Sequence, residues 1–433
     1  MRAPRALLLV VVLGLALGVA PRAEPQRAAI SRSGELAGAD YQIEVPADWR
    51  GGLVVFAHGI QRGPGKGTVR TPPIGHHIVA QGHAWIASGY REREYRPDLF
   101  IDDLLALREL FLKDVGQPRW AIIYGQSMGG HIVVATLEQR PGLYQGGLAE
   151  CGLVDGISIA DYLLAYTAAA ELIAGVPLLD APDRQAFARA LNERVVPALG
   201  RPGEYTARGR QFDSVVKYLM GADRAGNELP LRLDGLKPRY LMNMLYRNPD
   251  VEKETAPGAR AASTAHIRYR IDPGLGITEE ELNARVRRLH PAKDARSPAI
   301  DPVYAERTGR LTVPLLTLHE TGDAWVPLSL EQSYRRRTIA AGTDHLLVQR
   351  VVRAPSHCGF AMETRARAFD DLVAWIERGV RPQGEDVLAA DLSRIGLTWT
   401  PVLHPDDPLA ARRQPARGRH GAPRTFASHV GQK

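Results

Sequence analysis

Short apolar runs alternate with amphipathic segments along the first third of the chain. Four runs have the length and composition of buried strands. They span residues 53–57, 84–88, 120–124 and 145–150. Two intervening segments have apolar residues at helical spacing. One has Phe100, Leu104, Leu107 and Phe111 on a single face, and the other spans residues 128–139. This alternation is typical of a doubly wound, mostly parallel α/β sheet.

The alternation stops at residue 153, and the next stretch reads as helix, turn and helix. Ser158 is expected to cap a helix that runs to Ala174, and Thr278 with Glu281 forms the pattern of a capping box. Apolar runs then resume the sheet, which predicts one catalytic domain with an insertion. The expected parts are core at 40–152, a mainly helical cap at 153–312, core at 313–383, and a C-terminal extension at 384–433 whose end is a disordered basic tail.

The N-terminus has the pattern of a secretory signal. Arg2 and Arg5 precede an apolar stretch over residues 6–20. That stretch is shorter than the ~20 residues of a membrane span, so a stable membrane anchor is not expected. We therefore expect a signal peptide over residues 1–23 and a secreted or periplasmic protein.

A G-x-S-x-G pattern follows the third apolar run directly. Gly125, Ser127 and Gly129 form it, and residues 128–139 continue as a helix. Such a serine occupies a sharp strand-to-helix turn, where flanking glycines are needed because a side chain would collide with neighbouring elements. The context favours an exposed, nucleophilic Ser127 over an ordinary Gly/Ser turn.

A serine hydroxyl needs a base, and that base needs an orienting acid. Asp323 follows an apolar run at 314–319, and His357 follows another at 346–352. The carboxyl ends of parallel strands meet at one edge of a sheet, so Ser127, Asp323 and His357 are expected to converge there.

With these motifs the chain resembles the α/β-hydrolase superfamily, in particular its serine esterases and lipases. The resemblance also uses His58-Gly59, which follow the first apolar run. It implies an α/β-hydrolase fold with a helical cap, with Ser127 as nucleophile, His357 as base and Asp323 as the orienting acid.

The resemblance also implies two backbone donors for the oxyanion. Met128, directly after the nucleophile, is one of them. Ile60 is our choice for the second, and Gln61 remains an alternative because loop geometry cannot be read from sequence. His58 is expected to brace this loop rather than to transfer protons.

Other residues compete for the triad roles. Asp155 follows the run at 145–150, where some lipases of the superfamily place their acid, and Glu320 precedes Asp323 in the same loop. For the base, His319 falls inside a strand and His345 precedes one. His357 is therefore preferred.

Both cysteines of the chain lie near the expected catalytic edge. Cys358 follows the proposed base, and Cys151 ends the run after the nucleophile helix. In an oxidising compartment they can pair and tether the base. Feruloyl esterases and tannases look similar, but their second cysteine precedes the serine, where this chain has Gln126. Two free thiols are the alternative.

Charge and the remaining motifs exclude several functions. The net charge is +7, but residues 412–433 alone hold five arginines, one lysine and no acid. No basic stripe with interleaved aromatics is present, so nucleic-acid binding is not expected. The Gly-rich segment 63–68 lacks Walker spacing, and His76-His77 lack nearby ligands. No metal or cofactor is implied.

Large side chains of the cap could line an acyl pocket, although for any single one a place in the cap's own core is the favoured interpretation. They are Tyr162, Tyr166, Leu172, Tyr218, Met220, Met242, Met244 and Tyr246. The function expected from the sequence is hydrolysis of a small-molecule or polymeric carboxylic ester through an acyl-enzyme. The alternatives are a peptidase or amidase with the same triad, and a non-catalytic binding protein of the same fold.

Overall fold

The computed structural model describes residues 28–201, 204–224 and 247–401. The expected signal peptide over residues 1–23 and the basic tail beyond residue 401 lie outside these ranges. The same is true of three pocket candidates, Met242, Met244 and Tyr246. None of the helices within the described ranges has the length and hydropathy needed to cross a membrane.

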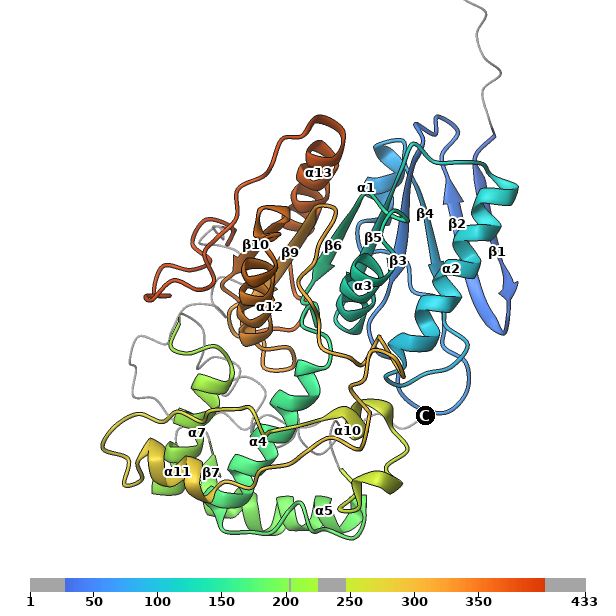
Figure 1. The fold of residues 1–433 in the computed structure, drawn as a ribbon. Helices are drawn as coiled ribbons and strands as arrows, with labels where there is room; N and C mark the ends of the chain where they lie inside the picture. The colour runs from blue at the N-terminus through green and yellow to red at the C-terminus, as the bar shows by residue number, and fades with distance from the viewer. Residues whose placement is uncertain (1–27, 202–203, 225–246, 402–433) are drawn as a thin grey trace, which may run out of the picture.

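An eight-stranded sheet forms the centre of the molecule (Figure 1). Its order is β1-β2-β4-β3-β5-β6-β9-β10; only the pairs β1–β2 and β2–β4 are antiparallel. The strands are β1 (Ile30–Leu36), β2 (Ala39–Val45), β3 (Gly52–Ala57), β4 (Ala84–Ser88), β5 (Trp120–Gln126), β6 (Gly146–Glu150), β9 (Leu315–Glu320) and β10 (Leu347–Val352). The predicted mostly parallel sheet is confirmed.

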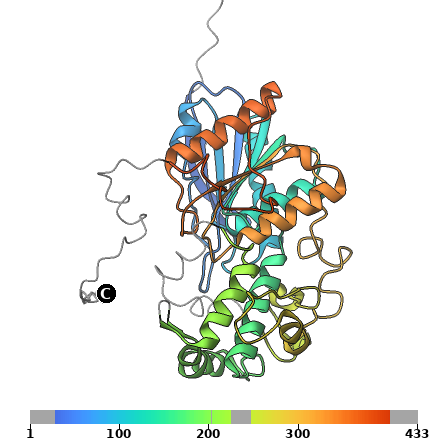
Figure 2. The ribbon, with the colours of Figure 1, turned by 90° about the vertical axis from the view of Figure 1, so that its left-hand side faces the viewer.

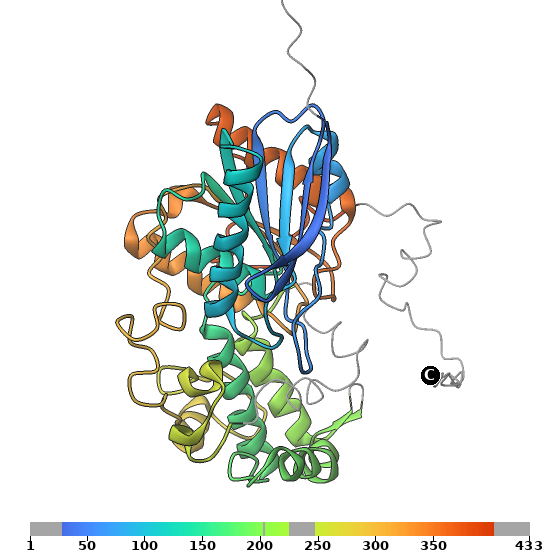
Figure 3. The same ribbon diagram turned by 90° about the vertical axis from the view of Figure 1, so that its right-hand side faces the viewer.

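Helices cover both faces of the sheet, as the turned views show (Figures 2 and 3). One face packs on α2 (Pro97–Asp114), α3 (Met128–Gln139) and α12 (Leu328–Ala341), and the other on α1 (Gly75–Ala80) and α13 (Met362–Arg378). Side chains of β3 alternate between the two cores: Leu53 and Val55 enter the first, Val54 and Phe56 the second. Burial on both faces explains why these strands read as unbroken apolar runs.

The chain leaves the sheet after β6 and returns at β9. The intervening elements gather at one end of the sheet (Figures 1, 2 and 3). They are α4 (Ser158–Ala174), α5 (Arg184–Ala190), the π-helix η1 (Leu191–Val195), α6 (Val196–Leu199), β7 (Gly200–Arg201), β8 (Glu204–Tyr205), α7 (Ala207–Leu219), η2 (Val251–Lys253), α10 (Pro257–Ala261) and α11 (Glu279–Arg285). A 3₁₀ turn, η3 (Asp344–Leu346), precedes β10.

One of the two predicted helix caps is confirmed. Thr278 accepts from the N–H of Glu281 while the Glu281 carboxylate accepts from the N–H of Thr278, so the capping box is present. The prediction for Ser158 is wrong. Ser158 is the first residue inside α4 and Ile157 takes the N-cap position, so the Ser158 side chain is not placed to cap the helix. Its hydroxyl donates to Asp155 at 2.7 Å.

Candidate active site

Ser127 occupies the turn between β5 and α3 with φ 54° and ψ −118°, a conformation rare outside glycine. Glycines make the turn possible: a Cβ on Gly129 would lie 1.9 Å from the carbonyl oxygen of Ala57, and one on Gly130 would lie 2.4 Å from the Cα of Gly152. This strained elbow, on a sheet of this strand order, defines the architecture. The chain has the α/β-hydrolase fold.

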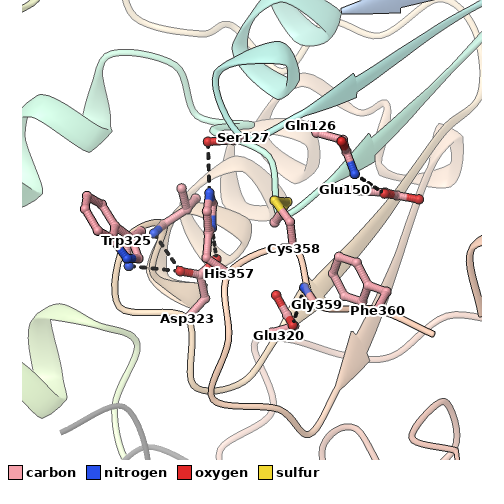
Figure 4. Close-up of a disulfide and its surroundings, with 12 residues drawn as sticks. Gln126, Ser127, Glu150, Glu320, Asp323, Trp325, His357, Cys358, Gly359 and Phe360 are labelled. Carbon is pink, nitrogen blue, oxygen red and sulfur yellow. Dashed lines mark hydrogen bonds and ion pairs between the residues drawn. A yellow bond between two sulfur atoms is a disulfide. The ribbon is translucent and has the colours of Figure 1, made fainter. Parts of the chain in front are cut away.

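Three side chains from the ends of different strands meet in one hydrogen-bonded relay (Figure 4). Nε2 of His357 lies 2.9 Å from Oγ of Ser127, and its Nδ1 lies 2.6 Å from Oδ2 of Asp323. Asp323 is fully buried, and its other oxygen accepts from the N–H groups of Trp325 and Val326 at 2.9 and 3.0 Å. Since the carboxylate has no proton to donate, Nδ1–H donates to it, which leaves Nε2 free to accept from the serine hydroxyl.

These contacts also shift the pKa of His357. Burial disfavours the charged imidazolium of His357, but the negative charge of Asp323 and its hydrogen bond outweigh this, so the pKa of His357 is raised above its usual 6.5. A more basic imidazole takes the serine proton more readily, provided that the pH is high enough to keep it neutral.

A disulfide ties the loop that carries the base to the sheet. Cys358, the residue after His357, is bonded to Cys151 with a Cα–Cα distance of 5.3 Å. Cys151 directly follows β6, the strand next to the one that ends at Ser127. Gln126, which takes the place of the second cysteine of feruloyl esterases and tannases, donates instead to Glu150 at 2.8 Å.

A buried ion pair holds the same loop from another side. Arg365 on α13 contacts Glu150 at 3.0 Å, and both side chains are almost fully buried. The guanidinium also donates to the carbonyl oxygens of Cys358 and Phe360, at 2.6 and 3.2 Å. Sequence reasoning missed this pair, because its members lie 215 residues apart and neither belongs to a motif.

Glu320, considered above as an alternative to Asp323, is a third group that holds the loop around His357. Its carboxylate accepts from the hydroxyl of Ser356 at 2.6 Å. It also accepts from the N–H of Gly359 at 2.9 Å (Figure 4). Burial and the nearby charge of Asp323 raise the pKa of Glu320 to about 7. It therefore holds the residues on both sides of His357 without contacting the imidazole nitrogens.

The loop after β3 approaches the nucleophile closely. A Cβ on Gly59 would lie 3.1 Å from the Cβ of Ser127. Ile60 lines the same cavity as Ser127 and Met128, whereas Gln61 does not. The side-chain amide of Gln61 instead binds the backbone of Thr68. It donates to the Thr68 carbonyl at 2.6 Å and accepts from the Thr68 N–H at 3.0 Å. The choice between the backbone N–H of Ile60 and that of Gln61 as the second oxyanion donor stays a prediction.

Tyr90 braces this loop and was missed by sequence reasoning, since no motif marks it. It is buried at φ 70°, and its hydroxyl donates to the carbonyl of His58 at 3.2 Å. The two rings pack with centroids 4.0 Å apart. Burial lowers the pKa of His58 to about 4, so this imidazole is neutral near pH 7 and supports the loop.

The other candidates for the triad are bound elsewhere. Asp155 is buried, pairs with Arg337 at 2.7 Å and accepts from the hydroxyl of Ser158. His319 lies inside β9, where Nε2 donates to the carbonyl of Val326 at 2.8 Å, and His345 falls in the 3₁₀ turn before β10. The structure brings none of the three to Ser127.

A cavity of about 760 Å³ opens above Ser127 and His357. Its inner wall is mostly apolar. This wall consists of Ile60, Met128, Leu153, Ile159, Leu163 and Val326. Such a volume accommodates a small organic substrate.

The aromatic residues proposed for an acyl pocket do not line this cavity. Tyr162, Tyr166 and Met220 are buried in the main core, and Leu172 packs against it, while Tyr218 donates to Asp272 at 2.8 Å. The face of α4 that carries Ile159, Ala160 and Leu163 turns to the cavity instead. Helical spacing identifies faces, but tertiary packing decides which face meets the cavity.

One cluster has the residue types of a metal site. Cys151, Cys358 and His357 place their ligand atoms within 4.8 Å of one another. Both sulfur atoms are committed to the disulfide and carry no thiolate charge. The cluster therefore does not fit a metal ion.

No protein-family model and no curated protein sequence matches the chain. Solved structures resemble it. Acylaminoacyl peptidase from Pyrococcus horikoshii is 12% identical over 83% of this chain and 44% of its own, with a TM-score of 0.40. Feruloyl esterase B from Aspergillus oryzae is 12% identical over 82% and 81%, at 0.43. Dipeptidyl peptidase 4 from Porphyromonas gingivalis is 11% identical over 81% and 35%, at 0.38. The chain spans less than half the length of these two peptidases, and the likeness concerns the fold alone.

Proposed function

We propose that this protein is a serine hydrolase that cleaves carboxylic esters through an acyl-enzyme. One observation carries the proposal: an unbroken hydrogen-bonded relay from Ser127 through His357 to Asp323, which opens into a substrate-sized cavity. The three groups are within hydrogen-bond reach in the order that nucleophilic catalysis requires.

In the first half-reaction Oγ of Ser127 attacks the carbonyl carbon of the ester while its proton passes to Nε2 of His357. The carbonyl oxygen becomes an oxyanion, which accepts from the N–H groups of Met128 and Ile60. Each such donor contributes about 3 kcal/mol to transition-state stabilisation. The intermediate collapses, the C–O bond to the alcohol breaks, and His357 returns the proton to the leaving oxygen.

In the second half-reaction a water molecule replaces the alcohol. His357 takes one proton from the water, the resulting hydroxide attacks the acyl carbon, and Oγ of Ser127 leaves and recovers its proton. Asp323 accepts the Nδ1 hydrogen bond throughout, and so stabilises the imidazolium without taking its proton.

The test uses p-nitrophenyl esters of increasing acyl length, together with an aminoacyl p-nitroanilide. We expect wild type to cleave the esters, Ser127→Ala to lose that activity, and Ser33→Ala, an exposed change on β1, to keep it. Cleavage of the anilide as fast as the esters would reassign the protein as a peptidase or amidase. Ester turnover surviving in Ser127→Ala would remove Ser127 as the nucleophile.

The proposal includes a cap and an export signal. Residues 153–312 act as the cap; in support, α4, α5 and α10 contribute Ile159, Arg184 and Pro257 to the wall of the cavity. The apolar stretch at 6–20 directs secretion, an assignment in keeping with a disulfide that persists in oxidising compartments. N-terminal sequencing of exported protein tests the signal: a start at Met1 would contradict it.

A further inference from the structure

Charged side chains crowd the mouth of the cavity above the apolar wall. They are Arg62, Glu92, Arg93, Glu94, Arg96 and Arg184. Arginines outnumber glutamates in this set by four to two. The partners of each group decide how much positive charge faces the substrate.

The guanidinium of Arg96 is already neutralised. It contacts Asp98 at 2.8 Å and Glu92 at 3.0 Å, so two carboxylates surround one cation. The other glutamate, Glu94, is exposed and accepts from the N–H of Gly63 at 3.1 Å. Neither glutamate forms an ion pair with Arg93 or Arg184 in the part of the chain that the structure describes.

Arg93 is held in place but keeps its charge. It lies in the loop between β4 and α2, and it donates to the carbonyl oxygens of Lys66 and Arg62, each at 3.2 Å. These carbonyls fix the direction of the guanidinium without supplying a compensating negative charge. No carboxylate among the described residues pairs with it.

Arg184 lines the mouth from a different part of the chain. It is the first residue of α5, in the excursion between β6 and β9, and its side chain is exposed. The preceding Asp183 uses its carboxylate to accept from the N–H of Ala186 at 2.7 Å. Among the residues that the structure describes, the side chain of Arg184 has no hydrogen-bond or ion-pair partner.

Two arginines from separate segments thus add uncompensated charge to one cavity that ends at Ser127. An anion in this cavity can be stabilised by two cations that both line it, and guanidinium groups bind carboxylates in a bidentate manner. We propose that the substrate carries an ionised carboxylate, held by Arg93 and Arg184 while the apolar wall holds the chain next to the scissile carbonyl. This inference rests on the proposed ester hydrolysis and names its substrate class.

The test compares esters that differ only in charge. p-Nitrophenyl hemiglutarate carries a carboxylate on the acyl side, p-nitrophenyl pentanoate is its neutral counterpart, and the pentanoate ester of 5-hydroxy-2-nitrobenzoate carries the carboxylate on the leaving group. We expect wild type to prefer one of the anionic esters by about tenfold in kcat/KM, mainly through KM. The preference should fall at 0.5 M NaCl, because salt screens exposed charges.

Substitutions locate the preference. Arg93→Gln combined with Arg184→Gln should abolish it, and Arg184→Lys should keep part of it. Arg189→Gln, an exposed change on the same helix outside the cavity, should leave it at the wild-type value. Because the readout is a ratio between two substrates, a general loss of activity does not imitate the result.

Two outcomes separate this inference from the proposed function. Ester turnover that depends on Ser127 but shows no preference for either anionic ester, or a preference that survives in the double variant, would overturn the inference alone. If no ester is cleaved, the proposed function fails, and calorimetric titration of Ser127→Ala with glutarate then decides. Binding that is lost in the double arginine variant supports the anion site, and absence of binding refutes it.

Discussion

Ser127 and His357, the proposed nucleophile and base, are held in place by different means. The elbow around Ser127 is set by contacts between backbones, with Gly129 against Ala57 closer than any side chain allows. The loop around His357 is set by side chains: a disulfide at Cys358 and hydrogen bonds to Glu320 and Arg365. Three side-chain interactions position the loop around His357, whereas close backbone packing positions Ser127.

This difference has an energetic meaning. A backbone collision cannot be relieved by rotating a side chain, so a change at the elbow acts on the whole strand–helix junction. In a loop held by several side-chain interactions, a single substitution removes only one of these stabilising interactions. We therefore expect all-or-none effects at the elbow and graded effects at the base.

The largest effect is expected for Gly129→Ala. The added Cβ would meet the carbonyl oxygen of Ala57 at 1.9 Å, and forcing the elbow apart should lower the free energy of unfolding by more than about 3 kcal/mol and abolish turnover. Urea denaturation and ester assays measure both. Gly142→Ala is the control. Gly142 has φ 89°, and a Cβ added there would have no atom within 4 Å. This variant should therefore lose about 1 kcal/mol to backbone strain and keep normal turnover. Equal stability of the two variants would contradict the steric account.

Arg365→Met should come next. It leaves Glu150 buried without its cation and releases the carbonyl of Cys358, which should cost about 3–5 kcal/mol of unfolding free energy and lower kcat. Denaturant titration and kinetics at a temperature where the variant stays folded measure the two effects. Arg367→Met, exposed on the same helix, should change stability by less than about 0.5 kcal/mol. An Arg365 variant as stable as this control would show that the ion pair contributes nothing.

Loss of the disulfide should be milder. Replacing both Cys151 and Cys358 by serine should lower the free energy of unfolding by about 2–4 kcal/mol, and turnover should slow because the base gains mobility while two tethers remain. Thermal unfolding and kcat give the result. Dithiothreitol should bring wild type to the same values and leave the double variant unchanged. A double variant with wild-type kcat would mean that Glu320 and Arg365 alone suffice.

The smallest effect is expected for Glu320→Gln, read from the pH dependence of kcat/KM. His357 acts as a base only when neutral, and its pKa is raised above 6.5, so activity should fall as the pH drops through that raised value. The charge of Glu320 contributes to the raised pKa. Because Glu320 has a pKa of about 7, it is ionised over only part of this pH range, and its removal should move the acidic limb to lower pH by a small amount. Glu363→Gln, exposed on α13, is the control, and an unmoved limb in Glu320→Gln would exclude the electrostatic contribution.

Much of this arrangement was predictable from sequence because it depends on local patterns. The apolar runs predicted the parallel strands. The positions just after strand ends predicted that Ser127, Asp323 and His357 are neighbours, and the structure brings them together. The hairpin of β1 and β2 was not predicted, since its turn is Ala37-Gly38 rather than the usual Asn-Gly.

Non-local features could not be predicted. The pairing of Glu150 with Arg365 and the brace from Tyr90 to His58 depend on packing between distant segments. For the same reason the cavity wall holds Ile159 and Leu163 rather than the aromatic residues proposed from composition.

The adjacency of β6 and β9 in the sheet has an evolutionary consequence. The excursion departs from the carboxyl end of β6 and returns to the amino end of its immediate parallel neighbour, as a crossover between parallel strands must. A segment joined in this way can be lengthened, shortened or exchanged between genes without reordering the sheet. Selection can therefore act on Arg184 and the rest of the excursion while the strand ends that carry Ser127, Asp323 and His357 stay the same.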